Sequence, residues 1–294
     1  MDNLLKLISK PDNVAIVIMI ILIIVYTVWA FRQANANDRR RRLGRNVEGS
    51  GDKKVETWPN LVRIEMLVSM VVIAGLMLWS ILLDAPLEEH ANPSVTPNPA
   101  KAPWYFLGLQ EMLVYFDPWI AGVVIPGLII FGLMAIPYLD INPKGNGYFT
   151  FSERKNAIII FCFGFLMLWI LLIVIGVFMR GPGWLWYWPW EAWDHNRVVF
   201  KANIDLTQYF GIDSRSLTGS VIGGSVVILY FGLGMILPYF LWKKRKSDFL
   251  KRLGMMRYIT LSFLFWAMIG LPIKIILTLT LNIKYLWVTP WFNI

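Results

Sequence analysis

The segment NAIIIFCFGFLMLWILLIVIGVF, residues 156–178, decides the fold class. It contains no charged side chain, and about 20 apolar residues in a helix are enough to cross the hydrocarbon core of a bilayer. Because a backbone in lipid must satisfy its own hydrogen bonds, we expect this run to be helical. The sequence lacks the alternating ten-residue segments of membrane barrels. It therefore predicts a helical membrane protein.

Five other runs of similar length are also predominantly apolar. The whole chain of 294 residues is 57% apolar and only 16% charged. Soluble domains have nearer one quarter of their residues charged. We expect an all-α polytopic membrane protein with about six transmembrane helices. The expected spans are Asn13–Phe31, Val62–Leu83, Trp119–Tyr138, Asn156–Phe178, Gly219–Trp242 and Met255–Leu281.

The basic residues indicate the orientation of these spans. The net charge is +9, and 19 of the 28 lysines and arginines lie on one side of the alternating spans, in three loops and at the adjoining span ends. By the positive-inside rule that side is cytoplasmic, so both termini and the loops 84–118 and 179–218 are expected to be periplasmic. We expect a multi-pass protein of a bacterial inner (cytoplasmic) membrane. Anionic lipid, and not nucleic acid, is the expected acidic partner.

The first of the basic loops contains Arg39–Arg42 together with Gly44, Gly49 and Gly51, and has no apolar periodicity. Such a composition is typical of a flexible linker. Residues 1–57 are therefore expected to form an N-terminal transmembrane helix followed by a basic cytoplasmic linker.

A Pro-rich stretch, ANPSVTPNPAKAPWYFLGLQE at residues 91–111, separates the second and third spans. It leads into the aromatic pair Trp104-Tyr105 at the expected edge of the bilayer. A simple membrane anchor needs no Pro-rich turn that carries aromatic residues to this position, so the stretch is a candidate for a binding site.

Several motifs, taken in order, resemble the C-terminal part of cytochrome b, which is subunit IV in two-gene quinol–cytochrome and plastoquinol–plastocyanin reductases. They are Trp58-Pro59-Asn60, Ala91-Asn92-Pro93, Thr96-Pro97, Trp104-Tyr105-Phe106-Leu107 and Pro137-Tyr138. The resemblance covers residues 58–184 and implies that three of the spans form a subunit-IV-like core. It also implies a role in quinol oxidation at the periplasmic face. In this family a Pro-Glu-Trp-Tyr motif lines the quinol-oxidising pocket.

The chain departs from that motif at its proton acceptor. It reads Ala102-Pro103-Trp104-Tyr105, and a proline cannot take a proton from quinol. General-base catalysis needs a titratable group within hydrogen-bond reach. If the segment after Pro103 is helical, Glu111 lies on the side of Trp104, about 10 Å along the axis.

Glu111 is therefore the predicted catalytic residue. The predicted quinone-binding residues are Pro103, Trp104, Tyr105, Phe106 and Glu111. Glu88, Glu89 and Asp117 are further candidates for the proton acceptor. Two alternatives stay open: Glu111 pairs with a basic residue or a polar partner subunit, and Tyr105 is an interfacial anchor and not a hydrogen-bond donor to quinone.

The expected redox centres lie on other chains. The two histidines, His90 and His195, fall in expected periplasmic loops, and Cys162 is the single cysteine, so we expect no metal site here. The resemblance implies partners: a cytochrome b N-terminal subunit with b haems, and a Rieske iron–sulfur protein, a multihaem cytochrome c, or both. A dimeric complex remains open.

Residues 185–294 are expected to form a Trp-rich periplasmic loop and two further spans. The tryptophans suit an aromatic belt at the headgroup level, or a contact with quinone or haem. Glycines of the fifth span, Gly223 and Gly234 among them, permit close packing against another subunit or the last span. Lys274, in the last span, is expected to snorkel to the interface.

These observations favour a membrane subunit of a bacterial cytochrome bc-type quinol:cytochrome c oxidoreductase. It would contribute to the periplasmic quinol-oxidising pocket in respiratory or photosynthetic electron transfer, with menaquinol or ubiquinol as substrate. The chain alone would hold no complete active site. The alternative is a non-catalytic membrane scaffold that anchors haem- or iron–sulfur-bearing partners.

Overall fold

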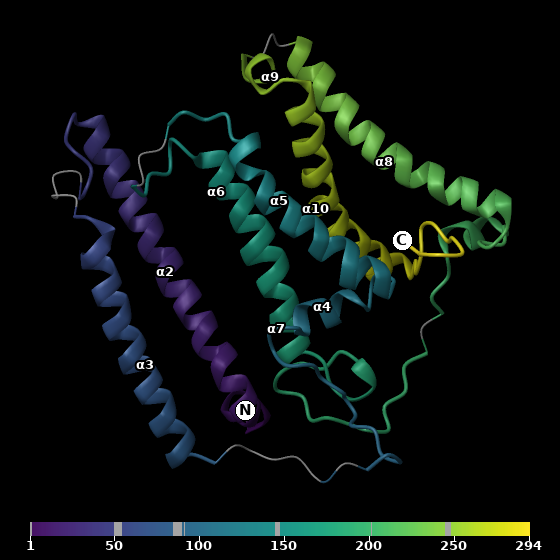
Figure 1. Ribbon diagram of the computed structural model, residues 1–294. Coiled ribbons are helices and arrows are strands. Elements are labelled where there is room, and N and C mark those ends of the chain that lie inside the picture. The colour runs from purple at the N-terminus through teal and green to yellow at the C-terminus, as the bar shows by residue number, and fades with distance from the viewer. Residues whose placement is uncertain are drawn as a thin grey trace. The chain divides into compact units, whose positions relative to one another are not determined.

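The computed structural model describes residues 2–49, 55–84, 90, 92–144, 148–200, 202–244 and 248–294. It is helical, as predicted, and contains no β-strand among the described residues beyond isolated bridges (Figure 1). The candidates Glu88 and Glu89 lie outside the described residues. The elements are α1 (Asp2–Ser9), α2 (Pro11–Arg42), η1 (Thr57–Leu61), α3 (Val62–Leu82), α4 (Leu107–Met112), η2 (Ile120–Val124), α5 (Ile125–Leu139), α6 (Lys155–Phe161), η3 (Cys162–Ile170), α7 (Leu171–Phe178), η4 (Pro182–Trp184), η5 (Leu206–Phe210), α8 (Leu217–Lys244), α9 (Asp248–Leu253) and α10 (Met255–Leu281).

Six helices among the described residues are long and apolar enough to cross a membrane, which confirms the predicted number. They are Asn13–Arg42, Thr57–Leu82, Ile120–Leu139, Lys155–Phe178, Leu217–Lys244 and Met255–Leu281. The predicted boundaries are close to these except at the C-terminal end of the first span. The chain divides into two compact units, which are described separately below: residues 9–97 with 145–154, and the remainder.

In the first unit, α2 continues through Arg42, so Arg39–Arg42 are helical and not part of a flexible linker. Arginine is a good helix former, and cations are favourable at the C-terminal end of a helix dipole. Side chains of this end also bind the loop at 148–153. Asp38 accepts hydrogen bonds from the amide and the hydroxyl of Ser152, at 2.9 and 2.8 Å. Arg41 forms an ion pair with Glu153.

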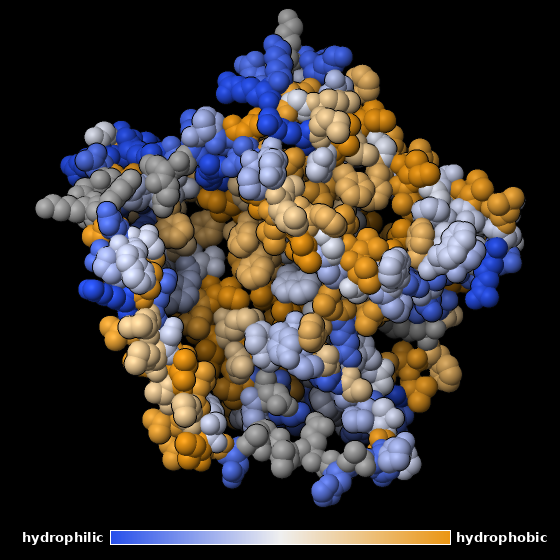
Figure 2. All heavy atoms as spheres, in the orientation of Figure 1, coloured by the Kyte–Doolittle hydropathy of each residue, from blue (hydrophilic) through white to orange (hydrophobic). Residues whose placement is uncertain are grey.

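Helix α3 of the same unit exposes apolar side chains around its whole circumference, and none of its residues is buried within this chain. Figure 2 shows these apolar side chains along its visible face. A helix that is apolar on all sides is typical of contact with lipid or with other helices in a membrane.

In the second unit, the short helix α4 packs against α7 (Figure 1). The two helices approach closely because each presents a glycine. A side chain at Gly176 would lie 3.1 Å from the carbonyl oxygen of Leu107, and one at Gly108 would lie 3.1 Å from Ile173. Around this contact lies the apolar core cluster of the unit. Its buried members are Met112, Tyr115, Phe116, Ile120, Ala121 and Leu172.

Helix α8 packs against α10, and the chain itself fills two of its glycine positions. The ring of Trp266 on α10 covers Gly234, and the backbone at Leu286 and Trp287 covers Gly223. The predicted partners of these glycines were another subunit or the last span. The last span packs against Gly234, and the segment that follows this span packs against Gly223.

Lys274 on α10 does not snorkel, contrary to the sequence-based expectation. Its side chain is only 2% exposed and donates a hydrogen bond to the carbonyl oxygen of Lys284. The chain that follows α10 folds back over the lysine and supplies an acceptor, so the ammonium group has a partner within the chain.

The close approach at Gly223 gives a test of this packing. A Cβ atom at Gly223 would lie 2.5 Å from the carbonyl oxygen of Leu286, whereas one at Gly232 on the same helix meets nothing within 4 Å. We predict that Gly223→Ala lowers the free energy of unfolding by about 1–3 kcal/mol, as overpacking does. Thermal unfolding in detergent measures the effect, with Gly232→Ala as the matched control. Equal melting temperatures for the two variants would contradict this packing.

Candidate functional site

The predicted site motif forms a turn, and the helix begins later than expected. The amide of Phe106 donates to the carbonyl of Pro103 at 2.9 Å, and that of Leu107 to Trp104 at 3.3 Å. Helix α4 then runs only from Leu107 to Met112. Pro103, Tyr105 and Phe106 are exposed, and the rings of Trp104 and Tyr105 meet edge to face with centroids 5.6 Å apart.

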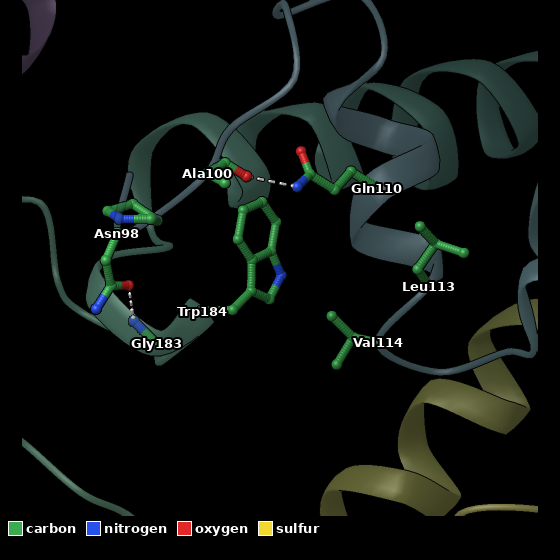
Figure 3. A pocket seen from close by; sticks show the side chains of 8 residues that line it. Asn98, Ala100, Gln110, Leu113, Val114, Gly183 and Trp184 are labelled. Atoms are coloured by element: carbon green, nitrogen blue, oxygen red, sulfur yellow. Dashed lines mark hydrogen bonds between the residues drawn. The ribbon is translucent and has the colours of Figure 1, made fainter. Parts of the chain in front are cut away.

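Gln110 fastens the Pro-rich loop to α4. Its side-chain oxygen accepts a hydrogen bond from the amide of Ala102, and its side-chain nitrogen donates to the carbonyl of Ala100, both at 2.8 Å (Figure 3 shows the second). One amide side chain thus satisfies a donor and an acceptor of a loop that has no secondary structure of its own. The loop is thereby fixed to the helix that carries Glu111.

Glu111 is buried, with an exposed fraction of 0%, and its carboxylate has three partners. Arg180 approaches it with two nitrogens, Nε at 2.9 Å from Oε2 and Nη2 at 2.5 Å from Oε1. The hydroxyl of Tyr115 donates to Oε1 at 3.0 Å, and the indole nitrogen of Trp184 lies 3.3 Å from Oε2. The open alternative that Glu111 pairs with a basic residue therefore describes the geometry, and that residue is Arg180.

Arg180 follows the end of α7 and is 7% exposed. A backbone bridge pairs it with Trp186, and its Nη1 donates to the carbonyl of Trp184 at 3.0 Å. The guanidinium also lies over the ring of Trp186, 5.7 Å from its centroid. These contacts hold the fork of the guanidinium in the plane that a bidentate carboxylate contact requires.

Burial and charge keep the partners of Glu111 in their donor forms. Burial raises the pKa of Tyr115, and the charge of Glu111 adds to that rise, so the phenol remains protonated. Burial by itself lowers the pKa of Arg180, but the hydrogen bond and charge of Glu111 outweigh it and leave the pKa raised. The cluster is thus a buried carboxylate held by one cation and one neutral hydroxyl.

A shallow, open depression of about 390 Å³, called the cavity below, adjoins this cluster. Trp184 is shared between the two, because its ring faces the cavity while its indole nitrogen contacts Glu111 (Figure 3). The five predicted quinone-binding residues do not line the cavity in this conformation. Its walls are formed by Asn98, Pro99, Ala100, Gln110, Leu113, Val114, Gly183 and Trp184.

Trp184 has an uncommon backbone conformation, with φ of 56°. Only a few per cent of residues other than glycine occupy this left-handed region, which carries strain. Two contacts hold it there: the amide of Trp184 donates to Gly181 at 3.0 Å, and its carbonyl accepts from Arg180. The arginine that holds Glu111 therefore also fixes Trp184, which contacts Glu111 and lines the cavity.

Asp117, a further candidate for the proton acceptor, has two hydrogen bonds to the protein. It accepts from the amide of Trp119 at 3.0 Å and from the side-chain amide of Asn293 at 3.1 Å. Within the described part of the chain, no group of three or more histidine, cysteine, aspartate or glutamate side chains could hold a metal ion.

Arg180, Tyr115 and Gln110 were not among the residues predicted from the sequence, and Trp184 was considered only as one of the tryptophans of the periplasmic loop. A signal for Tyr115 was available, because residues four apart share one face of a helix. Arg180 is a lone cation at the end of a long apolar run, which also marks it for attention. Its pairing with Glu111 joins positions 69 residues apart and required the structure.

Comparison with known proteins identifies one segment of the chain. Residues 90–181 match the family model for the C-terminal part of cytochrome b, described as cytochrome b(C-terminal)/b6/petD. This match confirms the resemblance read from the motifs. The matched segment contains Glu111, Tyr115 and Arg180. The match begins at residue 90, so the extension of the resemblance back to Trp58 stays a prediction.

Two relatives have similar sequences. The menaquinol:cytochrome c reductase cytochrome c subunit of Geobacillus thermodenitrificans is 35% identical over 92 residues, which are 30% of this chain and 37% of that protein. The protein of the same name from Bacillus subtilis is 33% identical over 90 residues, 28% of this chain and 34% of that protein. The chain thus spans little more than a third of the length of these relatives. No solved structure matches significantly.

The Glu111–Arg180 pair gives a test by stability. We predict that Arg180→Met lowers the free energy of unfolding by about 3–5 kcal/mol, because a buried carboxylate is left without its cation. The double variant Glu111→Gln/Arg180→Met should lose clearly less, since it removes both charges. Thermal unfolding of the two variants measures the difference. The pairing is contradicted if the double variant loses as much free energy of unfolding as Arg180→Met and Glu111→Gln lose together when each is measured alone.

Proposed function

We propose that this chain, whose residues 90–181 match the cytochrome b C-terminal family, is a membrane subunit of a bacterial cytochrome bc-type quinol:cytochrome c oxidoreductase. It contributes to the quinol-oxidising pocket on the periplasmic side. The observation that carries the proposal is the buried carboxylate of Glu111 beside a cavity with apolar walls. Both lie within the segment that matches the family, apart from the cavity residues Gly183 and Trp184 just beyond it.

The chemistry of the reaction explains why such a carboxylate is needed. Oxidation of a quinol to a quinone releases two electrons and two protons, so the pocket must offer a base as the electrons leave. Pro103 cannot act as that base. Glu111 lies eight residues further on, and its carboxylate is the group that we propose as the proton acceptor, with release of its contact to Arg180 as part of the step.

The cavity suits the ring of a quinol by size and by its walls. Leu113, Val114, Pro99 and the indole of Trp184 provide apolar surface, which is the common lining of small-molecule sites. The amide atoms of Gln110 are engaged with the loop, so we propose that Glu111 supplies the polar contact to the ring. Glu111 is the nearest carboxylate to this wall along α4.

Trp184 lines the cavity and its indole nitrogen contacts Glu111, so the proposal includes its movement. When the ring turns away, the carboxylate loses one weak donor at 3.3 Å and faces the cavity. Pro103, Trp104, Tyr105 and Phe106 then form the outer, membrane-facing edge of the pocket.

The chain requires partners for this reaction. The electrons pass to b haems on a cytochrome b N-terminal subunit and to a Rieske iron–sulfur protein or a haem c. The names of the two relatives support menaquinol as the substrate. The distribution of lysine and arginine supports an inner-membrane protein with the loops 84–118 and 179–218 in the periplasm.

A scaffold without a catalytic role is the second candidate. Two observations favour it: the family's glutamate is replaced by Pro103, and Glu111 is fully paired in a bidentate contact of the kind that can serve stability alone. The two candidates differ in what happens when Glu111 loses its charge but keeps its shape.

We predict that Glu111→Gln, in the assembled complex, lowers kcat for quinol-dependent cytochrome c reduction by about 10²- to 10⁴-fold, the usual contribution of a general base. The matched control is Glu191→Gln, which removes a carboxylate that also pairs with an arginine, Arg197, but in an exposed position. The control should keep normal turnover. Near-normal turnover of Glu111→Gln in an intact complex would falsify the catalytic role and leave the scaffold.

A further inference from the structure

The segment after α10, residues 283–294, is stabilised by its own hydrogen bonds and lies outside the family match. We call it the hook. Helix α10 ends at Leu281, and Asn282 reverses the chain in the left-handed conformation with φ of 53°. The amide of Trp287 then donates to the carbonyl of Ile294 at 3.1 Å, and the amide of Ile294 donates back to Trp287 at 2.9 Å. The hook is therefore a closed turn and not a loose tail.

The first half of the hook is anchored to the two last spans. Lys274 and Thr278 of α10 donate to the carbonyl oxygens of Lys284 and Ile283, the second at 3.0 Å. The indole nitrogen of Trp287 donates to the hydroxyl of Ser220 on α8 at 3.2 Å. Since Lys274 is buried, its hydrogen bond at the hook is a reason for a lysine at that position.

The second half of the hook reaches the base of the candidate site. Phe292 and Ile294 pack against the core cluster that contains Met112, Tyr115 and Phe116. Asn293, between them, donates to the carboxylate of Asp117 at 3.1 Å. The ring of Phe292 is held edge to face by Trp287, with centroids 5.3 Å apart.

Tyr115 connects this packing to the carboxylate. Its ring belongs to the core cluster that the hook covers, and its hydroxyl donates to Glu111 at 3.0 Å. Helix α4 has only six residues and cannot hold its place by its own hydrogen bonds, because isolated short helices are unstable. Packing of α4 against α7 and within the core cluster must therefore fix its position.

We infer that the hook is a positioning element for the quinol pocket, and that Phe292 is the positioning residue that holds Tyr115, and through it Glu111, in place. The inference rests on the proposed function for its catalytic consequence. It assigns a role to the hook, which the family match does not cover: the hook is anchored to α8 and α10 and packs against the core cluster that contains Tyr115.

The test uses the assembled complex with three variants. Phe292→Ala removes the ring, Phe292→Leu keeps most of its apolar volume, and Trp291→Ala changes a neighbouring ring that is 84% exposed. Two quantities are measured: KM and kcat for quinol, and hydrogen–deuterium exchange of the peptide that covers residues 107–117.

We expect Phe292→Ala to raise KM several-fold and to speed exchange over residues 107–117, while residues 156–178 exchange as in the wild type. Phe292→Leu should restore most of both properties, and Trp291→Ala should match the wild type. A purely structural role would lower the yield or the melting temperature without changing KM. Wild-type KM and exchange in Phe292→Ala would overturn the inference. If this variant does not assemble, Asn293→Ala, which removes the hydrogen bond to Asp117, is measured in the same way and decides it.

Failure of this inference can be told apart from failure of the proposed function, because exchange over α4 needs no turnover. If Glu111→Gln retains normal activity but Phe292→Ala loosens α4, the catalytic proposal fails and the packing role stands. If Glu111→Gln loses activity but Phe292→Ala changes neither KM nor exchange, the reverse holds.

Discussion

The buried contact between Glu111 and Arg180 is the interaction on which the rest of the site depends. It joins α4 to the chain just beyond α7, and the same guanidinium fixes the carbonyl of Trp184, which contacts Glu111 and lines the cavity. An isolated carboxylate in this position would be strongly unfavourable, so the fold must keep the arginine in place. The close glycine contacts between α4 and α7, and the clamp of Gln110 on the Pro-rich loop, can then be understood as features that hold the two charges together.

The chain has the aromatic pair Trp104-Tyr105 but a proline, Pro103, before it, and the nearby buried carboxylate is that of Glu111 on α4. Tyr115, Arg180 and Trp184 donate to this carboxylate. In the proposed function, Glu111 replaces the acidic residue of the family motif. The hook, which lies outside the matched segment, packs against the core cluster that contains Tyr115.

The sequence predicts the spans well because long apolar runs allow no other structure in lipid. It misses the helical end of α2 because a run of arginines suits both a linker and a helix terminus, and the contact of Asp38 with Ser152 decides between them. It misplaces Lys274 because the acceptor at Lys284 comes from a chain reversal that no periodicity shows. Within the site, Glu111 could be selected from its spacing to Trp104, whereas Arg180 depends on a contact between two distant segments.

A density map of the assembled complex with a bound quinone would show whether Glu111 reaches the substrate. We predict that the ring lies in the cavity beside Gln110 and Leu113, that Trp184 is turned away from its present position, and that the Glu111 carboxylate is within hydrogen-bond distance of a quinone oxygen. A ring bound elsewhere, with Glu111 still enclosed by Arg180, Tyr115 and Trp184, would contradict it.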